Sequence, residues 1–291
     1  MDQLLCLRSF LATVRCGNFS AAAREMNTVP SVISKRINYL EWSLGVKLFE
    51  RSSRQMALTH EGSRLHAQAA RLLNDFDAVQ DLFRQEEPAM AGQLKLRAST
   101  SLGLNLLADV IGVFQQDHPQ VQIDLMLVDR PVNPLEEGLD ISLAGRTDSY
   151  EGVVDIPLRP LEQFLCASPD YLSRHGSPSH PRDLTGHRTL VFNPTGGLWT
   201  FDSEHGVLRV EVRPSVSSND NTVLTKVALA GAGIAVLPAY AVRDAFRSGS
   251  LQPLLPAYPL QRAWIKAQVP ETRLALLRVQ AMLEALRQGL G

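Results

Sequence analysis

The sequence has few cysteines. Cys6, Cys16 and Cys166 are odd in number and lack the spacing of metal ligands. This pattern disfavours a disulfide framework and fits a reducing compartment with buried or free thiols. Small apolar packing residues are the favoured interpretation for Cys6 and Cys16, whereas a redox role for Cys166 stays open.

Long apolar runs are also missing. The longest uncharged stretch, residues 227–242, contains two glycines and a proline and is too short to cross a bilayer. No secretory signal is recognised, because Asp2 opens the sequence and Arg8 and Arg15 interrupt the first apolar stretch. We therefore expect a cytoplasmic protein with no membrane partner.

Motifs of common enzymes are lacking as well. The sequence has no G-x-S-x-G, no phosphate loop with Gly-Lys-Ser and no H-E-x-x-H. The glycines of AGAGIAVLP precede a predicted strand, which reverses the order of a dinucleotide-binding motif. His175, His180 and His187 lie in a loop region, where solvation is favoured over metal binding. We predict no enzyme activity, no metal and no cofactor.

The charge of the chain is unevenly distributed. Its net charge is −1, but residues 1–60 carry eight Lys and Arg against four Asp and Glu, whereas the remainder is acidic. A basic amino-terminal part on an acidic body fits a DNA-binding domain joined to a domain that does not bind DNA.

The segment 16–62 has the layout of a helix-turn-helix. A small-residue helix, SAAAREM, is followed by a break, NTVP, and by a second helix, SVISKRINYLEWSLG. Apolar residues at 33, 37, 40 and 44 give the second helix one buried stripe, which leaves its polar face for the DNA major groove. The bland alternative is a three-helix bundle with solvated charges.

This segment resembles the amino-terminal domain of the LysR-type transcriptional regulators, which is a winged helix-turn-helix. Fifteen positions within 47 residues carry the resemblance. They are Phe19, Ala22, Ala23, Ser34, Ile37, Leu40, Glu41, Leu44, Gly45, Leu48, Phe49, Arg51, Leu58, Thr59 and Gly62.

The resemblance and the residue chemistry together give candidate DNA contacts. Ser and Asn side chains can bond base edges, and Lys or Arg can reach guanine or phosphate. Pro30 suits the first helical turn, with Thr28 or Val29 as its N-cap. The candidates are Thr28, Pro30, Ser31, Val32, Ser34, Lys35, Arg36 and Asn38 of the second helix, and Arg51, Arg54 and Thr59 in or beside the wing.

A heptad pattern follows the wing. Leu65, Ala69, Leu72, Phe76, Val79 and Phe83 alternate at spacings of four and three, and Thr59 is placed to cap the helix. A seam between two subunits is favoured over packing of the helix on its own domain. We predict domains at 1–59 (winged helix-turn-helix), 60–91 (linker and dimerisation helix with hinge) and 92–291 (effector binding).

Strand and helix patterns alternate from residue 93 onward, which predicts α/β architecture with parallel sheets. We expect one strand over VLRVEVRPSVS, a short helix over PLEEGLD and a last helix over ETRLALLRVQAMLEALRQ. This region resembles the LysR-type effector domain, which is similar to two-lobed periplasmic binding proteins. Lobe one is expected at 92–161 and 266–291, and lobe two at 162–265.

A ligand of such a fold binds in the cleft at the carboxyl ends of the strands. Hydroxyl and N–H groups at Ser99, Thr100 and Ser101 would favour an anion such as a carboxylate, with Arg146 as its partner. Helix capping is the alternative for Ser99 and Thr100, and a surface ion pair for Arg146. By family position, Val128, Phe192, Asn219 and Ile234 line the same cleft.

The expected function is that of a sequence-specific transcriptional regulator controlled by a small-molecule effector. The expected partners are a two-fold site in promoter DNA, RNA polymerase and further copies of the chain as a dimer of dimers. A constitutive DNA-binding regulator without an effector and a cytoplasmic solute-binding protein are the alternatives.

Overall fold

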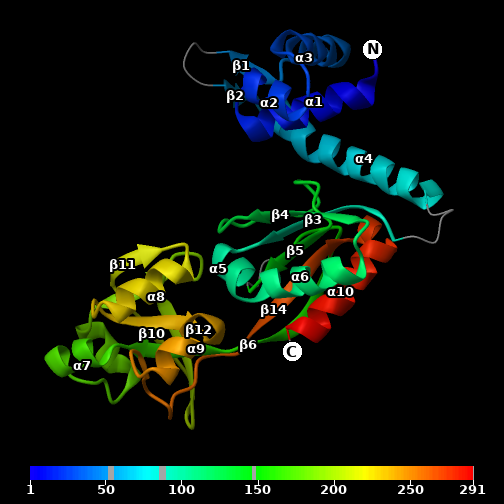
Figure 1. Ribbon diagram of the computed structural model, residues 1–291. Coiled ribbons are helices and arrows are strands. Elements are labelled where there is room, and N and C mark those ends of the chain that lie inside the picture. The colour runs from blue at the N-terminus through cyan, green and yellow to red at the C-terminus, as the bar shows by residue number, and fades with distance from the viewer. Residues whose placement is uncertain (52–55, 85–89, 146–148, 291) are drawn as a thin grey trace. The chain divides into compact units, whose positions relative to one another are not determined.

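The computed structural model describes residues 1–51, 56–84, 90–145 and 149–290. They form two compact units. The first holds the described residues up to 84 together with Asn133–Asp140 and Pro270–Leu276, and the second holds the other described residues. Each unit is described by itself below (Figure 1).

Three helices open the first unit: α1 Gln3–Cys16, α2 Phe19–Glu25 and α3 Pro30–Leu44. Their core is apolar and contains the fully buried Phe10, Ile33 and Ile37. The predicted helix-turn-helix is therefore confirmed, since α2 and α3 occupy the two expected segments. The N-cap of α3 is Val29, which forms no side-chain cap hydrogen bond, so the alternative cap, Thr28, is wrong.

A hairpin and a long helix follow. Strands β1 Phe49–Arg51 and β2 Met56–Leu58 pair in antiparallel fashion, as expected for the wing. Helix α4 His60–Arg84 begins where Thr59 Oγ1 accepts a hydrogen bond from the Gly62 N–H at 2.9 Å. Gly62 lets this turn approach the wing closely, because a Cβ there would lie 2.1 Å from the Leu48 carbonyl oxygen.

The second unit contains two five-stranded sheets. We call the part around the first sheet lobe one, whose strand order is β4-β3-β5-β14-β6. Helices α6 and α10 pack against each other and cover one face of this sheet (Figure 1). The elements of lobe one are β3 Gly92–Ala98, α5 Thr100–Leu102, the π-helix η1 Gly103–Leu107, α6 Ala108–Asp117, β4 Val121–Leu127, β5 Ile141–Ala144, β6 Val153–Leu161, β14 Ala263–Pro270 and α10 Leu277–Gly289.

Lobe two is built around the sheet β11-β8-β12-β7-β13. One buried cluster, which includes Leu224 and Val242, packs with α8 and α9, and another, around Tyr171 and Phe201, involves α7 and the β9–β10 hairpin. The elements are β7 Gln163–Ala167, α7 Pro169–His175, the 3-10 helix η2 Pro181–Gly186, β8 Thr189–Phe192, β9 Leu198–Ser203, β10 Gly206–Glu211, β11 Pro214–Ser218, α8 Asn221–Leu229, β12 Ile234–Pro238, α9 Ala239–Arg247 and β13 Gln252–Pro253.

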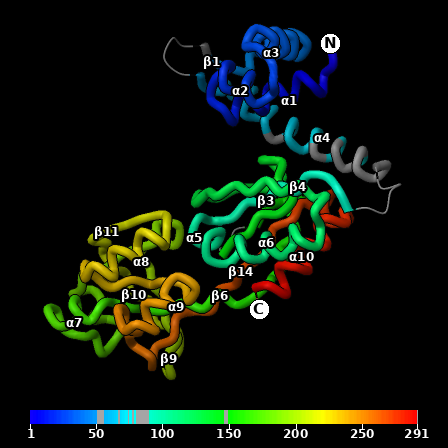
Figure 2. Tube along the Cα trace, in the orientation of Figure 1, coloured from blue at the N-terminus to red at the C-terminus, as the bar shows by residue number. Residues whose placement is uncertain are grey.

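The chain crosses twice between the lobes, once from β6 into β7 and once into β14 (Figure 2). The alternating pattern predicted parallel sheets, but both sheets are mixed, because each crossing brings in a strand that runs antiparallel to its neighbour. Strand β14 returns to lobe one and pairs antiparallel with β5, and β7 pairs antiparallel with β12.

Three element predictions were wrong. VLRVEVRPSVS splits into β10, which pairs with β9, and β11, which pairs with β8, so the chain changes sheets between them. PLEEGLD forms turns and no helix, with Gly138 in the left-handed region at φ 68°. The last helix begins at Leu277, after the 3-10 turn η3 Glu271–Arg273, whose buried Arg273 pairs with Asp140 at 3.5 Å.

Candidate functional site

Helix α3 exposes a polar stripe. Ser31, Lys35 and Asn38 are exposed, and their spacing of four and three places them on one helix face. Trp42, which is 78% exposed, continues this stripe by one further turn and was not among the predicted contacts. The stripe lies opposite the buried Ile33 and Ile37, so the core fixes its orientation.

The remaining candidates of α3 differ in their surroundings. Pro30 is exposed at the first helical position, whereas Thr28, Val32 and Ser34 are half-buried. Arg36 is half-buried too, and its Nη1 donates to Ser9 Oγ on α1 at 3.3 Å. Arg36 therefore has a structural role between α1 and α3.

The wing residues are only partly described. The Arg51 backbone belongs to β1, its side chain is not described, and Arg54 lies outside the described residues. Thr59 is half-buried, and its hydroxyl donates to the Lys47 carbonyl at 2.6 Å while accepting from Gly62. The capping role predicted for Thr59 is thus confirmed.

Glu41 anchors α3 to the wing. Its side chain is 3% exposed, and the carboxylate accepts from Leu48 N–H at 3.0 Å and from Lys47 Nζ at 2.7 Å. Burial alone would raise the pKa of Glu41, but these hydrogen bonds and one from the Phe49 N–H outweigh it and lower the pKa. Glu41 is therefore a buried anion that holds the start of β1.

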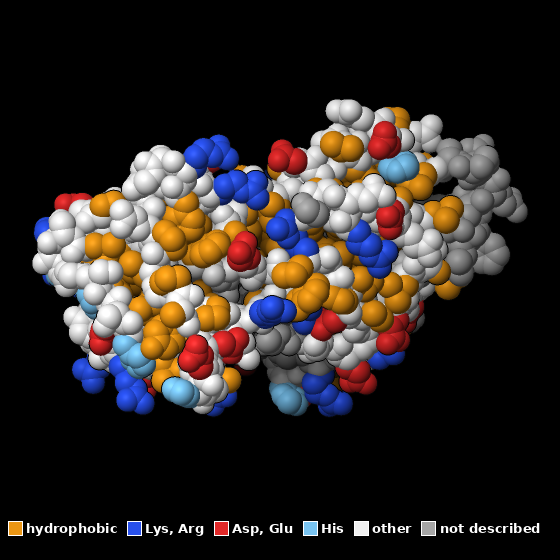
Figure 3. Space-filling model, turned by 90° about the horizontal axis from the view of Figure 1, so that it is seen from below, with side chains coloured by type: hydrophobic (Ala, Val, Ile, Leu, Met, Phe, Trp, Pro, Cys, Tyr) orange, Lys and Arg blue, Asp and Glu red, His pale blue; other side chains and the backbone are white. Residues whose placement is uncertain are grey.

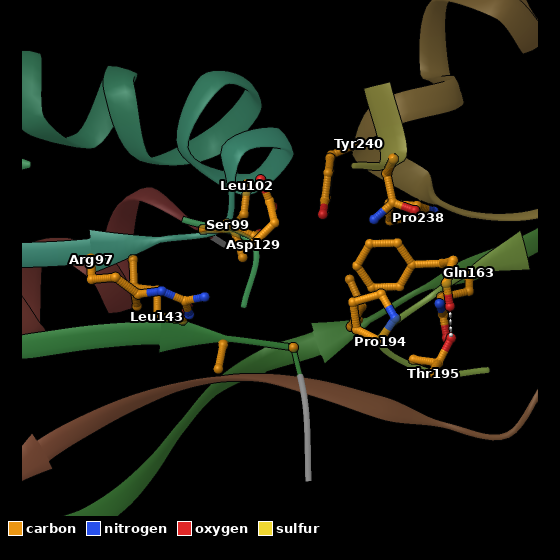
Figure 4. Close-up of a pocket in the computed structure, with 15 residues that line it drawn as sticks. Arg97, Ser99, Leu102, Asp129, Leu143, Gln163, Pro194, Thr195, Pro238 and Tyr240 are labelled. Carbon is orange, nitrogen blue, oxygen red and sulfur yellow. Dashed lines mark hydrogen bonds between the residues drawn. The ribbon is translucent and has the colours of Figure 1, made fainter. Parts of the chain in front are cut away.

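A pocket opens between the lobes of the second unit (Figure 4). It has an empty volume of about 590 Å³, including space open to solvent, and mixes apolar walls with a few polar side chains. Such a lining suits a small organic ligand. The lining residues are Arg97, Ser99, Leu102, Asp129, Leu143, Ala144, Gly145, Leu161, Gln163, Phe192, Pro194, Thr195, Asn221, Pro238 and Tyr240.

Arg97 forms one end of this pocket. The residue is 4% exposed, and its guanidinium donates to the carbonyl oxygens of Leu143 at 3.3 Å, Arg130 at 2.7 Å and Val128. These bonds fix a positive group in the pocket wall. Figure 4 shows the guanidinium extending along the wall that Ser99 and Asp129 also form.

The carboxylate of Asp129 lies at the start of α5. The Asp129 carboxylate accepts hydrogen bonds from the Thr100 N–H at 3.0 Å and from the Thr100 hydroxyl. Across the pocket, the Tyr240 hydroxyl of lobe two lies 3.3 Å from Ser101 Oγ of lobe one. Burial raises the pKa of Tyr240, which keeps this phenol neutral.

Only part of the predicted effector set lines the pocket. Ser99 and Phe192 do. Ser99 is also the N-cap residue of α5, but its side chain forms no capping hydrogen bond, and the Thr100 N–H donates to Asp129. The other described residues of this set do not line it. Thr100 and Ser101 bond neighbours as described, Val128 offers its carbonyl to Arg97, Asn219 is exposed, Ile234 is fully buried in the lobe-two core, and Arg146 lies outside the described residues.

Two family models match this arrangement. Residues 4–63 match the model of the bacterial regulatory helix-turn-helix protein, lysR family, and residues 89–291 match the model of the LysR substrate binding domain. The chain belongs to the LysR family of transcriptional regulators.

Relatives of similar length agree with the LysR assignment. The uncharacterised HTH-type transcriptional regulator YhjC of Escherichia coli (strain K12) is 30% identical over 98% of this chain and 97% of its own length. The regulator DmlR of the same organism is 30% identical over 97% of this chain and 92% of its own length. The solved structure of CrgA, a LysR-type regulator from Neisseria meningitidis, is 27% identical, covers 99% of this chain and 98% of that chain, and has a TM-score of 0.64.

As a LysR-family regulator, the chain combines a helix-turn-helix DNA-binding domain with an effector-binding domain. Within the described residues, no helix combines the length and apolar character needed to cross a bilayer. On the face drawn in Figure 3, basic and acidic side chains are interspersed with apolar ones.

Sequence reasoning missed several pocket residues, of which the polar ones are Arg97, Asp129, Gln163, Thr195, Asn221 and Tyr240. The rule that ligands bind at the carboxyl ends of strands would have found Arg97 and Asp129, since they lie at and just beyond the ends of β3 and β4. Nothing in the local sequence marks Gln163 or Tyr240.

Cys166 lies in the centre of lobe two. It belongs to β7 and is fully buried, and burial raises the pKa of its thiol to about 12. Because the thiolate is the reactive form, this cysteine is an apolar packing residue in the described state. The histidines also have structural partners: the His175 ring stacks on Tyr171, and His187 Nδ1 lies 3.1 Å from the Tyr171 hydroxyl.

Proposed function

We propose that this regulator reads its DNA site with the stripe Ser31, Lys35 and Asn38 of α3, with Ser34 beside it. The exposure of these three side chains on a helix whose opposite face is buried is the observation that carries the proposal. Lys can bond guanine or phosphate and Asn can bond adenine, so the stripe offers both positioning and base contacts. Arg51 and Arg54 remain predicted phosphate contacts of the wing.

The proposal also includes an effector in the pocket between the lobes. That molecule would stabilise one packing of the lobes and so change DNA binding by thermodynamic coupling, worth about 1–3 kcal/mol in typical cases. Contact with RNA polymerase, the absence of enzyme activity and a cytoplasmic location are parts of the same proposal. The predicted domain boundaries and an anionic group on the effector also stay as predictions.

The proposed function also includes a symmetric oligomer, which would bring two copies of α3 to one DNA site. The first half of the α4 seam packs on the helix-turn-helix core through Leu65 and Ala69. Farther along, Leu72, Phe76 and Val79 are 48%, 38% and 51% exposed in the single chain. An apolar stripe of this spacing fits a second copy of α4, which would present two reading helices to half-sites about 34 Å apart or a multiple of that distance.

A mobility-shift titration with upstream DNA at two salt concentrations tests the reading helix. Lys35→Ala with Asn38→Ala should abolish site-specific retardation. Arg24→Ala, which removes another exposed cation of the same unit, is the matched control and should retain it. Retardation that survives the double substitution, or that the control removes equally, would contradict the assignment of α3. Binding of the unaltered protein should weaken as salt rises.

A further inference from the structure

Two opposite charges share one wall of the effector pocket. Arg97 lies at the end of β3, and Asp129 follows the end of β4, the strand that pairs with β3 in parallel up to Ala98 and Leu127. The Arg97 guanidinium bonds the carbonyls of Val128 and Arg130, the residues on either side of Asp129. A cation and an anion are therefore held side by side on lobe one (Figure 4).

Asp129 disfavours a simple acid in this pocket. Its carboxylate accepts two hydrogen bonds from Thr100, whereas an ionised carboxylate offers about four acceptor sites. The remaining capacity suits a donor on the ligand, such as an ammonium group. A ligand with only a carboxylate would bring a second negative charge close to Asp129, and a ligand with only an amine would be repelled by Arg97.

The opposite wall, from lobe two, has different chemistry. Phe192, Pro194 and Pro238 present apolar surface, and Gln163 and Asn221 contribute neutral carboxamides. In Figure 4, the lobe-two residues lie across the pocket from Arg97 and Asp129. A ligand whose charges are at one end and whose body is apolar or amide-bearing matches this division.

We propose that the effector is a small zwitterion of the α-amino acid type. Its carboxylate faces Arg97, its ammonium group faces Asp129, and its side chain lies against Phe192, Pro194 and Pro238. The ammonium and carboxylate groups of an α-amino acid are attached to the same carbon atom. This close spacing matches the pocket wall, because the Arg97 guanidinium bonds the backbone carbonyls on either side of Asp129. This inference rests on the proposed function of the pocket, and it replaces a simple anion by an acid that also carries a donor.

Thermal shift of the full-length protein with the twenty L-amino acids is the first test, because a ligand that binds the folded state raises the melting temperature. Each amino acid that does so is compared by calorimetry with its deaminated acid and its decarboxylated amine. For L-phenylalanine these are 3-phenylpropionate and phenethylamine. We expect at least one amino acid to bind, with both analogues weaker by about tenfold or more.

The substitution Asp129→Asn tests whether the negative charge of Asp129 contributes to ligand binding. The amide oxygen can still accept from Thr100, so the fold is kept while the charge is removed. Affinity for the amino acid should fall by about tenfold or more, and the preference over the deaminated acid should vanish. Asp124→Asn, which neutralises an exposed carboxylate of β4 outside the pocket, is the control and should change neither value.

The inference is overturned if no amino acid raises the melting temperature. It is also overturned if the deaminated acid binds the unaltered protein as tightly, or if Asp129→Asn leaves the preference intact. A ligand without an ammonium group that stabilises the protein and alters DNA retardation would uphold the proposed effector site and reject only the zwitterion. Failure of the proposed DNA-reading function would appear separately, in the mobility shifts of the α3 variants, whose substituted residues do not line the pocket.

Discussion

Removal of the Glu41 carboxylate should release the wing from α3. Glu41→Ala leaves the N–H groups of Leu48 and Phe49 without their acceptor, and both residues are at most 5% exposed. A buried donor left unsatisfied costs about 1–3 kcal/mol, so two of them give a loss of about 2–6 kcal/mol. Glu41→Gln keeps a neutral acceptor and should cost about 1–2 kcal/mol.

Lys47→Ala is the matched control for this prediction. The Lys47 side chain is 74% exposed, so its ion pair with Glu41 should contribute roughly 0–1 kcal/mol. Hydrogen exchange of peptides within residues 42–50 measures the local opening free energy without assuming that the whole chain unfolds in one step. If Lys47→Ala opened this segment as much as Glu41→Ala, the ion pair and not the two N–H groups would hold the wing.

The same group gives a pH dependence. The pKa of Glu41 is lowered in the folded state, so its stabilisation is present above the ordinary glutamate pKa of about 4.3 and is lost as pH falls through the folded value. The protection factor of this segment, which corrects for the intrinsic pH dependence of amide exchange, should therefore fall below about pH 4.3 in the unaltered protein. Glu41→Gln should flatten that dependence.

Three further predictions concern packing, assembly and thiol reactivity. Gly62→Ala should destabilise the first unit by about 1–3 kcal/mol in thermal unfolding, because its Cβ would meet the Leu48 carbonyl oxygen, whereas Gly112→Ala, with open space around its Cβ, should not. Leu72→Glu with Phe76→Glu should lower the mass measured by light scattering, and Gln68→Glu, also exposed on α4, should not; an unchanged mass would refute the α4 seam. Cys166 should resist iodoacetamide at pH 8 until the protein unfolds, since its thiol is buried with a pKa of about 12, and rapid labelling of the folded protein would contradict this.

The amino-terminal domain could be predicted well because its signals are local. The apolar spacing of Ile33, Ile37 and Leu40 sets the buried face of α3, and the polar stripe follows from it. The role of Arg36 could not be foreseen, because its partner Ser9 lies 27 residues away on α1. A basic residue of α3 thus forms a hydrogen bond to α1 that no local pattern indicates.

The pocket was harder to predict, because it combines strand ends and helix starts that are distant in sequence. Ser99 and Phe192 were found, but the carboxamide that lines the pocket is Asn221 at the start of α8 and not the exposed Asn219. A shift of two residues along a strand-to-helix connection cannot be resolved from spacing. Ile234 was misplaced because β12 directs it into the lobe-two core.

The hydroxyl contact between Ser101 and Tyr240 joins the lobes beside the pocket over 3.3 Å. A neutral bond of this kind is worth only about 0.5–1.5 kcal/mol, so thermal motion breaks and remakes it constantly. The two lobes would then sample open arrangements without a bound effector. A molecule bound between the lobes would select among arrangements that the protein already samples, instead of forcing the lobes into a new one.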